Sequence, residues 1–195
     1  MDPKRIIVGV SGASGVQYGI EVIKALMEYK IETHVIITKW AEYVMLNESN
    51  MDRTEIEKIT PYVYDESDMS AKIASSSSLI DGMVIIPATV KTVSNIAVAN
   101  TGNLIARAAD IMLKMKRTLI IGIRETPISP PCIQNLAKLS AYGAIILPLS
   151  PGFYHNPQNI QDLYDFITGK VLDCLNIPNS KYKRWKMEKD LYPNQ

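Results

Sequence analysis

The chain has 195 residues, of which 47% are hydrophobic and 21% charged, and its formal net charge is +1. This composition is typical of one globular domain and gives no bulk charge that would attract nucleic acid or an anionic membrane. No apolar run approaches the roughly 18–20 residues of a membrane span. The two cysteines, Cys132 and Cys174, lack metal-type spacing, and the first strand begins too early for a signal peptide. We therefore expect a soluble cytoplasmic protein without a metal site.

The first predicted strand covers residues 5–10 and runs through a glycine turn, Gly-Val-Ser-Gly-Ala-Ser-Gly at 9–15, into a helix over 14–29. This order opens a doubly wound α/β domain, whose ligand lies at the carboxyl ends of the strands. Helix N–H groups at such a turn attract an anion, usually a phosphate. The glycine spacing differs from the dinucleotide fingerprint, and the second strand, 33–38, ends without an acidic residue. A mononucleotide phosphate is favoured, with a turn that binds no ligand as the alternative.

Apolar runs and helical periods alternate along the rest of the chain, as expected for parallel strands covered on both faces. Further strands are predicted at 82–87, 118–123 and 143–148, and further helices at 39–47, 92–99, 103–116 and 131–141. Residues 49–81 are expected to form a short helix, an edge strand and a loop. A last helix is expected to have Asn156 as its N-cap and Pro157 in its first turn. The alternation predicts a single three-layer α/β/α domain over 1–178, with a Rossmann/flavodoxin-like parallel sheet.

Polar residues follow two of these strands directly. After 82–87 come Thr89, Val90, Lys91 and Thr92. Their hydroxyls and N–H groups could bind an anion or a heteroaromatic edge, whereas plain N-capping would explain one threonine but not both. After 118–123 come Arg124 and Glu125. A half-buried glutamate there could move protons, and a structural arginine–glutamate pair is the equal alternative.

Three other cations lie on predicted helices. Arg107 and Lys114 share one face of the helix 103–116, with Asp110 between them. Spacing alone favours a surface ladder of ion pairs, and the alternative is a pair of cations that binds a phosphate. Lys170 lies at the edge of the apolar stripe of the last helix. Its stem could cover apolar surface, or its charge could enter an enclosed pocket.

The C-terminal segment 179–195 interleaves basic with aromatic residues, among them Tyr182, Arg184 and Trp185. Such a mixture can bind nucleic acid, but the charge balance of the rest of the chain does not support this function. We predict instead an arm that packs on a neighbouring subunit.

Seven motifs along the chain occur in the order and spacing of a known family. They are G-x-S-G-A-S-G at 9–15, T-K-W-A at 38–41, D-G-M-V-I-I-P-A-T at 81–89, N-L-I-x-R-A-A-D at 103–110, L-K at 113–114, R-E-T-P at 124–127 and P-G-F-Y-H-x-P at 151–157. This set resembles the UbiX-type flavin prenyltransferases, which belong with the homo-oligomeric flavin-containing decarboxylase-like flavoproteins. The similarity runs from about residue 4 to 178, and the last two motifs are the most discriminating.

The resemblance implies a metal-independent transferase. Such enzymes bind reduced FMN and join the dimethylallyl group of dimethylallyl phosphate to flavin N5 and C6. The product, prenylated FMN, serves a UbiD-type decarboxylase. The family assembles as a dodecamer with sites at subunit interfaces, which would also suit the C-terminal arm.

The resemblance also implies roles for residues at matching positions. The flavin-binding set is Gly12, Ala13, Ser14, Thr38, Thr89, Val90, Lys91, Thr92 and Arg124. The prenyl-phosphate set is Arg107, Lys114, Tyr154 and Lys170. The catalytic set is Glu125, as the carboxylate that handles protons, with Ser14, Glu48 and Lys114.

The chain departs from the family at two places. Lys170 stands where the family usually has arginine, and lysine keeps the charge but loses the bidentate fork. Residues 129–135 replace the usual sequence of that loop.

Two other functions compete with the transferase. One is an FMN-dependent cysteine decarboxylase, although the chain lacks the catalytic histidine and the P-x-M-N-x-x-M clamp of those relatives. The other is a non-catalytic flavin carrier for a partner decarboxylase, in which Glu125 and Lys114 would be dispensable.

Overall fold

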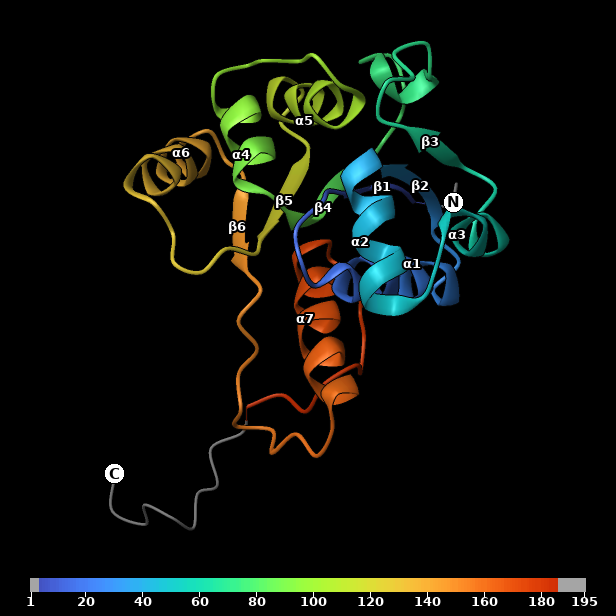
Figure 1. Ribbon diagram of the computed structural model, residues 1–195, viewed down its shortest axis with the longest axis vertical. Coiled ribbons are helices and arrows are strands. Elements are labelled where there is room, and N and C mark those ends of the chain that lie inside the picture. The colour runs from blue at the N-terminus through green and yellow to red at the C-terminus, as the bar shows by residue number, and fades with distance from the viewer. Residues whose placement is uncertain (1–3, 186–195) are drawn as a thin grey trace.

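The computed structural model describes residues 4–185 and contains, within them, one parallel sheet of six strands in the order β3-β2-β1-β4-β5-β6 (Figure 1). The strands are β1 (Arg5–Val10), β2 (Glu32–Ile37), β3 (Val63–Asp65), β4 (Gly82–Ala88), β5 (Thr118–Ile123) and β6 (Ile145–Pro148). The apolar runs predicted as strands all pair in this sheet, and β3 is the predicted edge strand. Every residue of β4 is buried, as its unbroken apolar run requires at the centre of a covered sheet.

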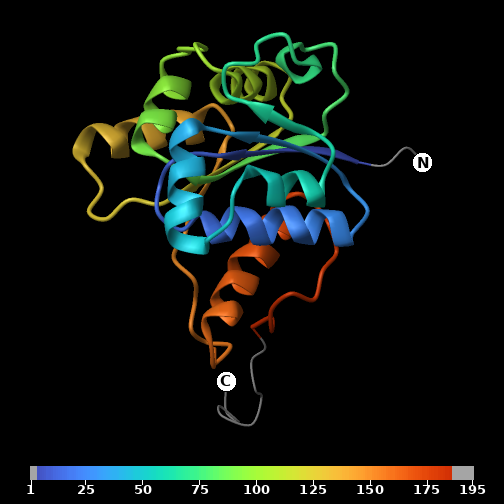
Figure 2. The ribbon, with the colours of Figure 1, turned by 45° about the vertical axis from the view of Figure 1, so that its right-hand side comes forward.

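Helices cover both faces of the sheet and make the three layers that Figure 2 shows. One face carries α1 (Val16–Glu28), α2 (Lys39–Ser49), α3 (Arg53–Ile59) and α7 (Ile160–Cys174). The other carries α4 (Val90–Ala97), α5 (Leu104–Lys114), α6 (Pro130–Ala141) and the short turn η1 (Lys72–Ala74). Alternate residues of β1 enter the two cores, Val8 on the α1 side and Ile7 on the α5 side, because side chains alternate along a strand. The predicted three-layer α/β/α class is therefore confirmed.

The last helix begins three residues later than predicted. Its N-cap is Asn159, whose side-chain oxygen accepts a hydrogen bond from the Asp162 N–H at 3.1 Å, while the Asp162 carboxylate accepts one from the Asn159 N–H at 3.3 Å. Asn156 has φ 55°, a left-handed conformation that cannot start a helix. The prediction of Asn156 as the N-cap is wrong because the reciprocal capping box at Asn159 is the stronger start signal.

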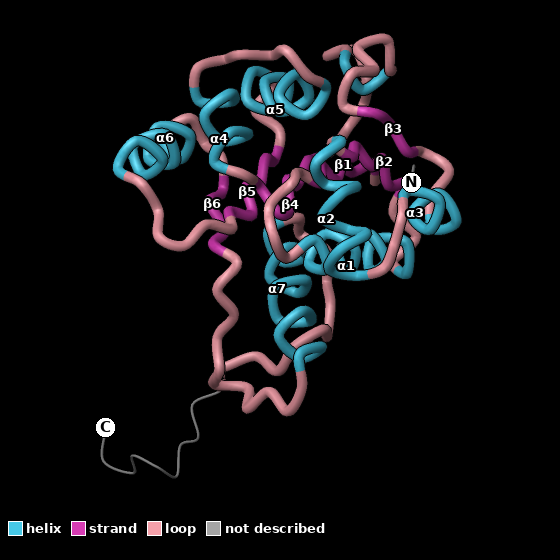
Figure 3. Tube along the Cα trace, in the orientation of Figure 1, coloured by secondary structure: helices cyan, strands magenta, loops and turns pink. Residues whose placement is uncertain are grey.

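Two connecting segments lie beside α7. The chain leaves β6 as a loop that reaches the start of α7, and after α7 it turns back along the same helix (Figures 1 and 3). Residues 179–185 of the predicted arm pack on their own chain, where the Asn179 side-chain amide donates to Asp173 at 2.9 Å. Residues 186–195 of the arm lie outside the described residues, so its packing on a neighbouring subunit stays a prediction. Within residues 4–185, no helix combines the length and apolar character needed to cross a membrane.

Candidate active site

A crevice lies at the carboxyl ends of β1 and β4, where the strand order reverses. From β1 the chain adds β2 and β3 on one side, and then returns to add β4, β5 and β6 on the other. Ligands of open α/β sheets bind at such a switch point. The buried Ser11 joins the two strand ends, because its hydroxyl donates to the Pro87 carbonyl at 2.8 Å and accepts from the Thr89 N–H at 2.9 Å. One hydroxyl thus fixes both walls of the crevice.

Five of the predicted flavin-binding residues line this crevice, whose volume is about 160 Å³: Gly12, Thr38, Thr89, Lys91 and Thr92. Thr38 caps α2 by accepting from the Ala41 N–H at 3.1 Å, and Thr89 caps α4 by accepting from the Thr92 N–H at 3.1 Å. The hydroxyls of Thr89 and Thr92 lie 2.9 Å apart, so N-capping explains Thr89 and a second hydrogen bond explains Thr92. The amino-terminal ends of α2 and α4 therefore both face the crevice and favour an anion there.

The glycine turn before α1 forms a third wall. Gly15 has φ 88°, which a residue with a Cβ rarely adopts. A Cβ on Gly12 would lie 2.4 Å from the Cβ of Trp40, so glycine is required there by the close approach of α2. The Gly15 N–H donates to Glu48 Oε2 at 2.8 Å. The structure thus brings Glu48 to the turn that carries Ser14. This proximity is what the prediction of both residues as members of one catalytic set requires.

Arg124 lies beside the same turn, and its side chain reaches to 4.0 Å from where a Cβ on Gly15 would lie. Its Nε is buried and has no hydrogen-bond partner among residues 4–185. A buried donor left in this way costs about 1–3 kcal/mol, and a bound anion would remove that cost. Glu125 is half-buried, and no ion pair among the described residues joins it to Arg124. Burial and the nearby Glu125 carboxylate raise the pKa of the Cys132 thiol.

Sequence reasoning did not assign the other five residues that line the crevice to the site: Ser11, Trp40, Glu66, Asn95 and Asn103. The Glu66 carboxylate accepts from the Lys39 N–H at 3.0 Å and from the Asn103 side-chain amide at 3.0 Å. Glu66 therefore connects the starts of α2 and α5. Asn103 opens a motif already noted and could have been found as an N-cap, whereas Glu66 lies in an irregular segment without any signal.

Tyr154 and Lys170 form a second cluster, around α7. The Lys170 Nζ lies 4.8 Å from the ring centre of Tyr182 and 5.4 Å from that of Phe166. Its hydrogen bond to Tyr182 raises the pKa of Lys170, so this lysine is charged at neutral pH. Tyr154 packs edge-on against Trp185, with ring centres 5.4 Å apart. Trp185 is a further candidate that only its place in the basic and aromatic segment had suggested.

His155 has no hydrogen-bond partner for either ring nitrogen among the described residues, although both nitrogens are buried. Its ring stacks instead on Phe166, with ring centres 5.1 Å apart and planes at 14°. In the single chain this histidine therefore belongs to the aromatic packing around Tyr154.

Arg107 and Lys114 lie away from the crevice in the single chain. The Arg107 Nε donates to the Ala74 carbonyl at 3.1 Å. Lys114 lines a separate open hollow together with Asp110, Lys138 and Tyr142. None of the ion pairs found in residues 4–185 involves Asp110, so the predicted surface ladder is not formed.

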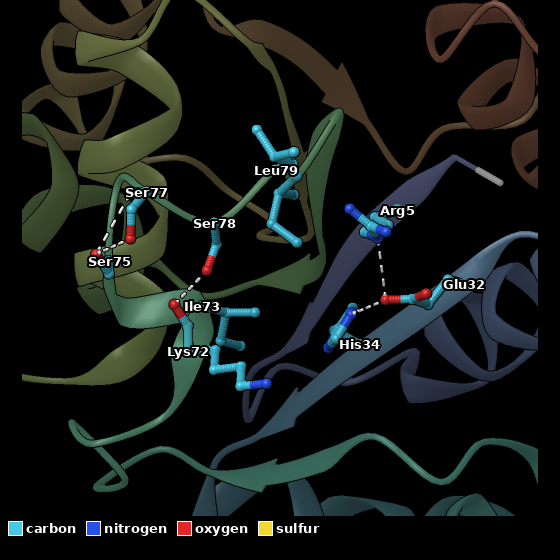
Figure 4. Close-up of a pocket in the computed structure, with 10 residues that line it drawn as sticks. Arg5, Glu32, His34, Lys72, Ile73, Ser75, Ser77, Ser78 and Leu79 are labelled. Atoms are coloured by element: carbon cyan, nitrogen blue, oxygen red, sulfur yellow. Dashed lines mark hydrogen bonds and ion pairs between the residues drawn. The ribbon is translucent and has the colours of Figure 1, made fainter. Parts of the chain in front are cut away.

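A larger cavity, of about 540 Å³, lies at the opposite edge of the sheet and contains none of the predicted site residues (Figure 4). Arg5 and His34 both pair with the Glu32 carboxylate, at 3.4 and 3.0 Å. The other ring nitrogen of His34 lies 3.0 Å from the Tyr64 hydroxyl. These polar groups satisfy one another, so they stabilise the amino-terminal edge of β1 and β2.

Comparisons with known proteins agree with this geometry. A family model described as Flavoprotein matches residues 1–172. The flavin prenyltransferase LpdB of Lactiplantibacillus plantarum is 42% identical over 184 residues, which are 94% of this chain and 98% of the relative. The chain belongs to the UbiX-type flavin prenyltransferases, within the flavoprotein family.

Two solved structures of UbiX-type proteins share the fold over almost their whole length. The crystal structure of AnUbiX, in complex with FMN and dimethylallyl pyrophosphate, has a TM-score of 0.93 and 35% identity and covers 95% of this chain and 98% of that one. A dodecameric FMN-dependent UbiX-like decarboxylase from Escherichia coli O157:H7 has a TM-score of 0.91 and 32% identity, with 94% and 100% covered. The flavin prenyltransferase family expected from the motifs is therefore confirmed.

Proposed function

We propose that this flavin prenyltransferase transfers the dimethylallyl group of dimethylallyl phosphate to N5 and C6 of reduced FMN. The observation that carries the proposal is the crevice between β1 and β4, together with Arg124, whose side chain lies beside the glycine turn and whose buried Nε has no partner among the described residues. Helix starts and a buried cation fit the phosphate of a mononucleotide. The complex of AnUbiX with FMN and dimethylallyl pyrophosphate supports the same pair of ligands here.

FMN would be held by the turn Gly12-Ala13-Ser14, by Thr38, by the segment Thr89–Thr92 and by Arg124. When bound, reduced FMN supplies the two ring atoms that accept the prenyl group. The helix starts bind its phosphate, and the hydroxyls of Thr89 and Thr92 are available to its polar edges. The absence of a side chain at Gly12 lets Trp40, which also lines the crevice, lie close to the turn.

Departure of the phosphate from the allyl group requires preorganised cations around it, since negative charge collects there as the bond breaks. Arg107, Lys114 and Lys170 would supply these cations, and Tyr154 a hydroxyl. Glu125 would act as the acid or base that takes the C6 proton and protonates the departing phosphate. Ser14 and Glu48 would be supporting catalytic residues, and Glu48 accepts a hydrogen bond from the Gly15 N–H, next to Ser14 in the chain.

The position of Arg107 and Lys114 favours an oligomeric site. Both lie away from the crevice of their own chain, and a neighbouring subunit could present them to it. A dodecamer, as in the Escherichia coli relative, would repeat this arrangement at every interface. Prenylated FMN would then pass to a UbiD-type decarboxylase in the cytoplasm.

The test is anaerobic incubation of the purified protein with reduced FMN and dimethylallyl phosphate, followed by the mass of the released flavin. We expect a flavin heavier by one five-carbon prenyl unit. Bound but unchanged FMN would favour the carrier or the cysteine decarboxylase, and the absence of flavin binding would contradict the assigned crevice.

A further inference from the structure

The carboxylate of Asp173, near the end of α7, receives four hydrogen bonds from the segment that follows the helix. The Asn179 side-chain amide donates at 2.9 Å and the Tyr182 hydroxyl at 2.7 Å. Arg184 adds a bidentate pair, with nitrogen–oxygen distances of 2.7 and 3.0 Å. Three residues of the returning segment are thus held by one side chain of the helix.

The returning segment lies directly on the backbone of α7. A Cβ on Gly169 would be 2.3 Å from the ring of Tyr182, so this ring occupies the place of a side chain. The same ring lies 4.8 Å from the Lys170 Nζ, a cation–π contact. Fixing Tyr182 therefore also fixes the position of the Lys170 ammonium.

The far end of the segment reaches Tyr154. Trp185 packs perpendicular to the Tyr154 ring at 5.4 Å, directly after the arginine that Asp173 holds. Asp173 itself touches neither Tyr154 nor Trp185 in any of the contacts above. Its influence on this pair passes through the chain from Arg184.

The Asp173 side chain stays charged at neutral pH. The hydrogen bonds of Arg184, Tyr182 and Asn179 lower the pKa of the Asp173 carboxyl. A carboxylate with a lowered pKa stays charged until the pH falls through that lowered value. Its ion pair with the segment is therefore kept over the same pH range. A fully exposed ion pair would contribute little, but bidentate geometry and two further donors make this one specific.

We propose that Asp173 is a positioning residue for the prenyl donor. By holding Tyr182 and Arg184, it keeps Lys170 against the Tyr182 ring and Trp185 against Tyr154, and so sets the affinity for an allylic phosphate. The inference rests on the proposed function, because the cluster matters to turnover only if it binds that donor.

The position of the segment can be measured without activity. The chain has two tryptophans, so protein labelled with 5-fluorotryptophan gives two ¹⁹F signals, and Trp185→Phe identifies the one from the segment. In the unaltered protein we expect a broad Trp185 signal, because a ring that is held in place tumbles only as slowly as the whole protein. In Asp173→Ala and Arg184→Ala it should narrow, because the ring is released from Tyr154. Lys183→Ala, whose side chain has no hydrogen bond or ion pair to the described residues, is the matched control and should leave the signal broad.

Kinetics of the full-length protein then test the role. We expect both alanine variants to raise the KM for dimethylallyl phosphate about tenfold, the loss expected for one charge-assisted contact, with kcat and FMN affinity nearly unchanged. Arg184→Lys should recover part of the affinity, because it keeps the charge and loses the bidentate geometry. Arg184→Ala also covers the case in which Asp173→Ala fails to fold.

Three results would overturn the proposal. A Trp185 signal that stays broad in both alanine variants would show that Asp173 does not hold the segment. A released Trp185 with an unchanged KM would show that the segment does not serve the donor, while the transferase activity stands. An unaltered protein that binds FMN but makes no prenylated product would overturn the donor site itself, and the proposed function with it.

Discussion

Gly12 has no side chain, and this lets the glycine turn before α1 lie in contact with α2. A methyl group there would meet Trp40 at 2.4 Å, a distance that real Cβ contacts do not show. The neighbouring atoms are the Cβ and backbone of Trp40, which cannot rotate away. The turn, and with it one wall of the crevice, must therefore move if the residue is changed.

Gly12→Ala should lower both stability and flavin affinity. Overpacking of this kind costs about 1–3 kcal/mol, and each kcal/mol shifts the thermal midpoint by about 2–4 °C in a chain of this length. We expect FMN affinity to fall by about tenfold or more, measured by flavin fluorescence. Gly102→Ala is the control, since the nearest atom to its Cβ would be a movable side-chain oxygen at 3.4 Å. Equal effects of the two substitutions would contradict the close approach at Gly12.

Glu125→Gln tests the residue proposed to handle protons. General acid–base catalysis contributes about 10²–10⁴-fold, and the amide keeps the shape of the side chain but cannot transfer the proton. We expect turnover to fall by that factor while FMN binding is retained, measured by product mass and flavin titration. Glu57→Gln, on the exposed face of α3, should leave both unchanged. Full turnover in Glu125→Gln would support the carrier function.

For individual residues, the sequence predicted which ones lie at the strand ends, but not their hydrogen-bond partners. The threonines and Arg124 were found because they follow apolar strands, and a parallel sheet collects such residues at one edge. The bridge that Ser11 makes between Pro87 and Thr89 spans more than 70 positions and has no local pattern. The same holds for Glu66, whose two hydrogen bonds depend on how distant helices pack.

Among the elements, α7 shows where local signals compete. Asn156 followed by proline and Asn159 followed three residues later by aspartate are both start signals, and only the second forms a reciprocal pair. Helix ends are the least certain part of a sequence-based assignment for this reason. The interior of α7 was correctly assigned, because its apolar stripe depends on burial rather than on one residue.

The two asparagines give a direct test of this start. Asn159→Ala should cost about 1 kcal/mol, the usual loss of an N-cap, and lower the thermal midpoint at fixed protein concentration. Asn156→Gly should be neutral or slightly stabilising, since glycine adopts its left-handed conformation freely. The reverse order of the two midpoints would restore Asn156 as the N-cap.

In the whole molecule, the separation of Arg107 and Lys114 from the crevice predicts sites shared between subunits. Lys114→Ala and Glu125→Gln should each be nearly inactive alone. If the two residues of one site come from different copies, co-expressed mixed oligomers should recover about one quarter of the unaltered turnover, because each correct copy is present half the time.

A mixture of Arg124→Ala with Glu125→Gln is the matched control for this experiment. These neighbouring residues belong to one chain, so no site in a mixed oligomer contains both, and no activity should return. Recovery in this control, or none in the first mixture, would contradict the assignment of Lys114 to a neighbouring subunit. The oligomer was the part of the site least accessible to sequence reasoning, since no pattern within one chain fixes which copy supplies a cation.

The serine bridge between β1 and β4 also makes ligand binding and folding parts of one equilibrium. The strands on its two sides form separate halves of the sheet, and a molecule seated in the crevice touches both. Ser11→Ala leaves the Thr89 N–H without its acceptor and should cost about 1–3 kcal/mol. A ligand at a hundred times its Kd returns about 2.7 kcal/mol to the folded state. Thermal melting of Ser11→Ala should therefore show a lower midpoint than that of the unaltered protein. Excess FMN should offset most of this decrease, because the bound nucleotide connects the two halves of the sheet.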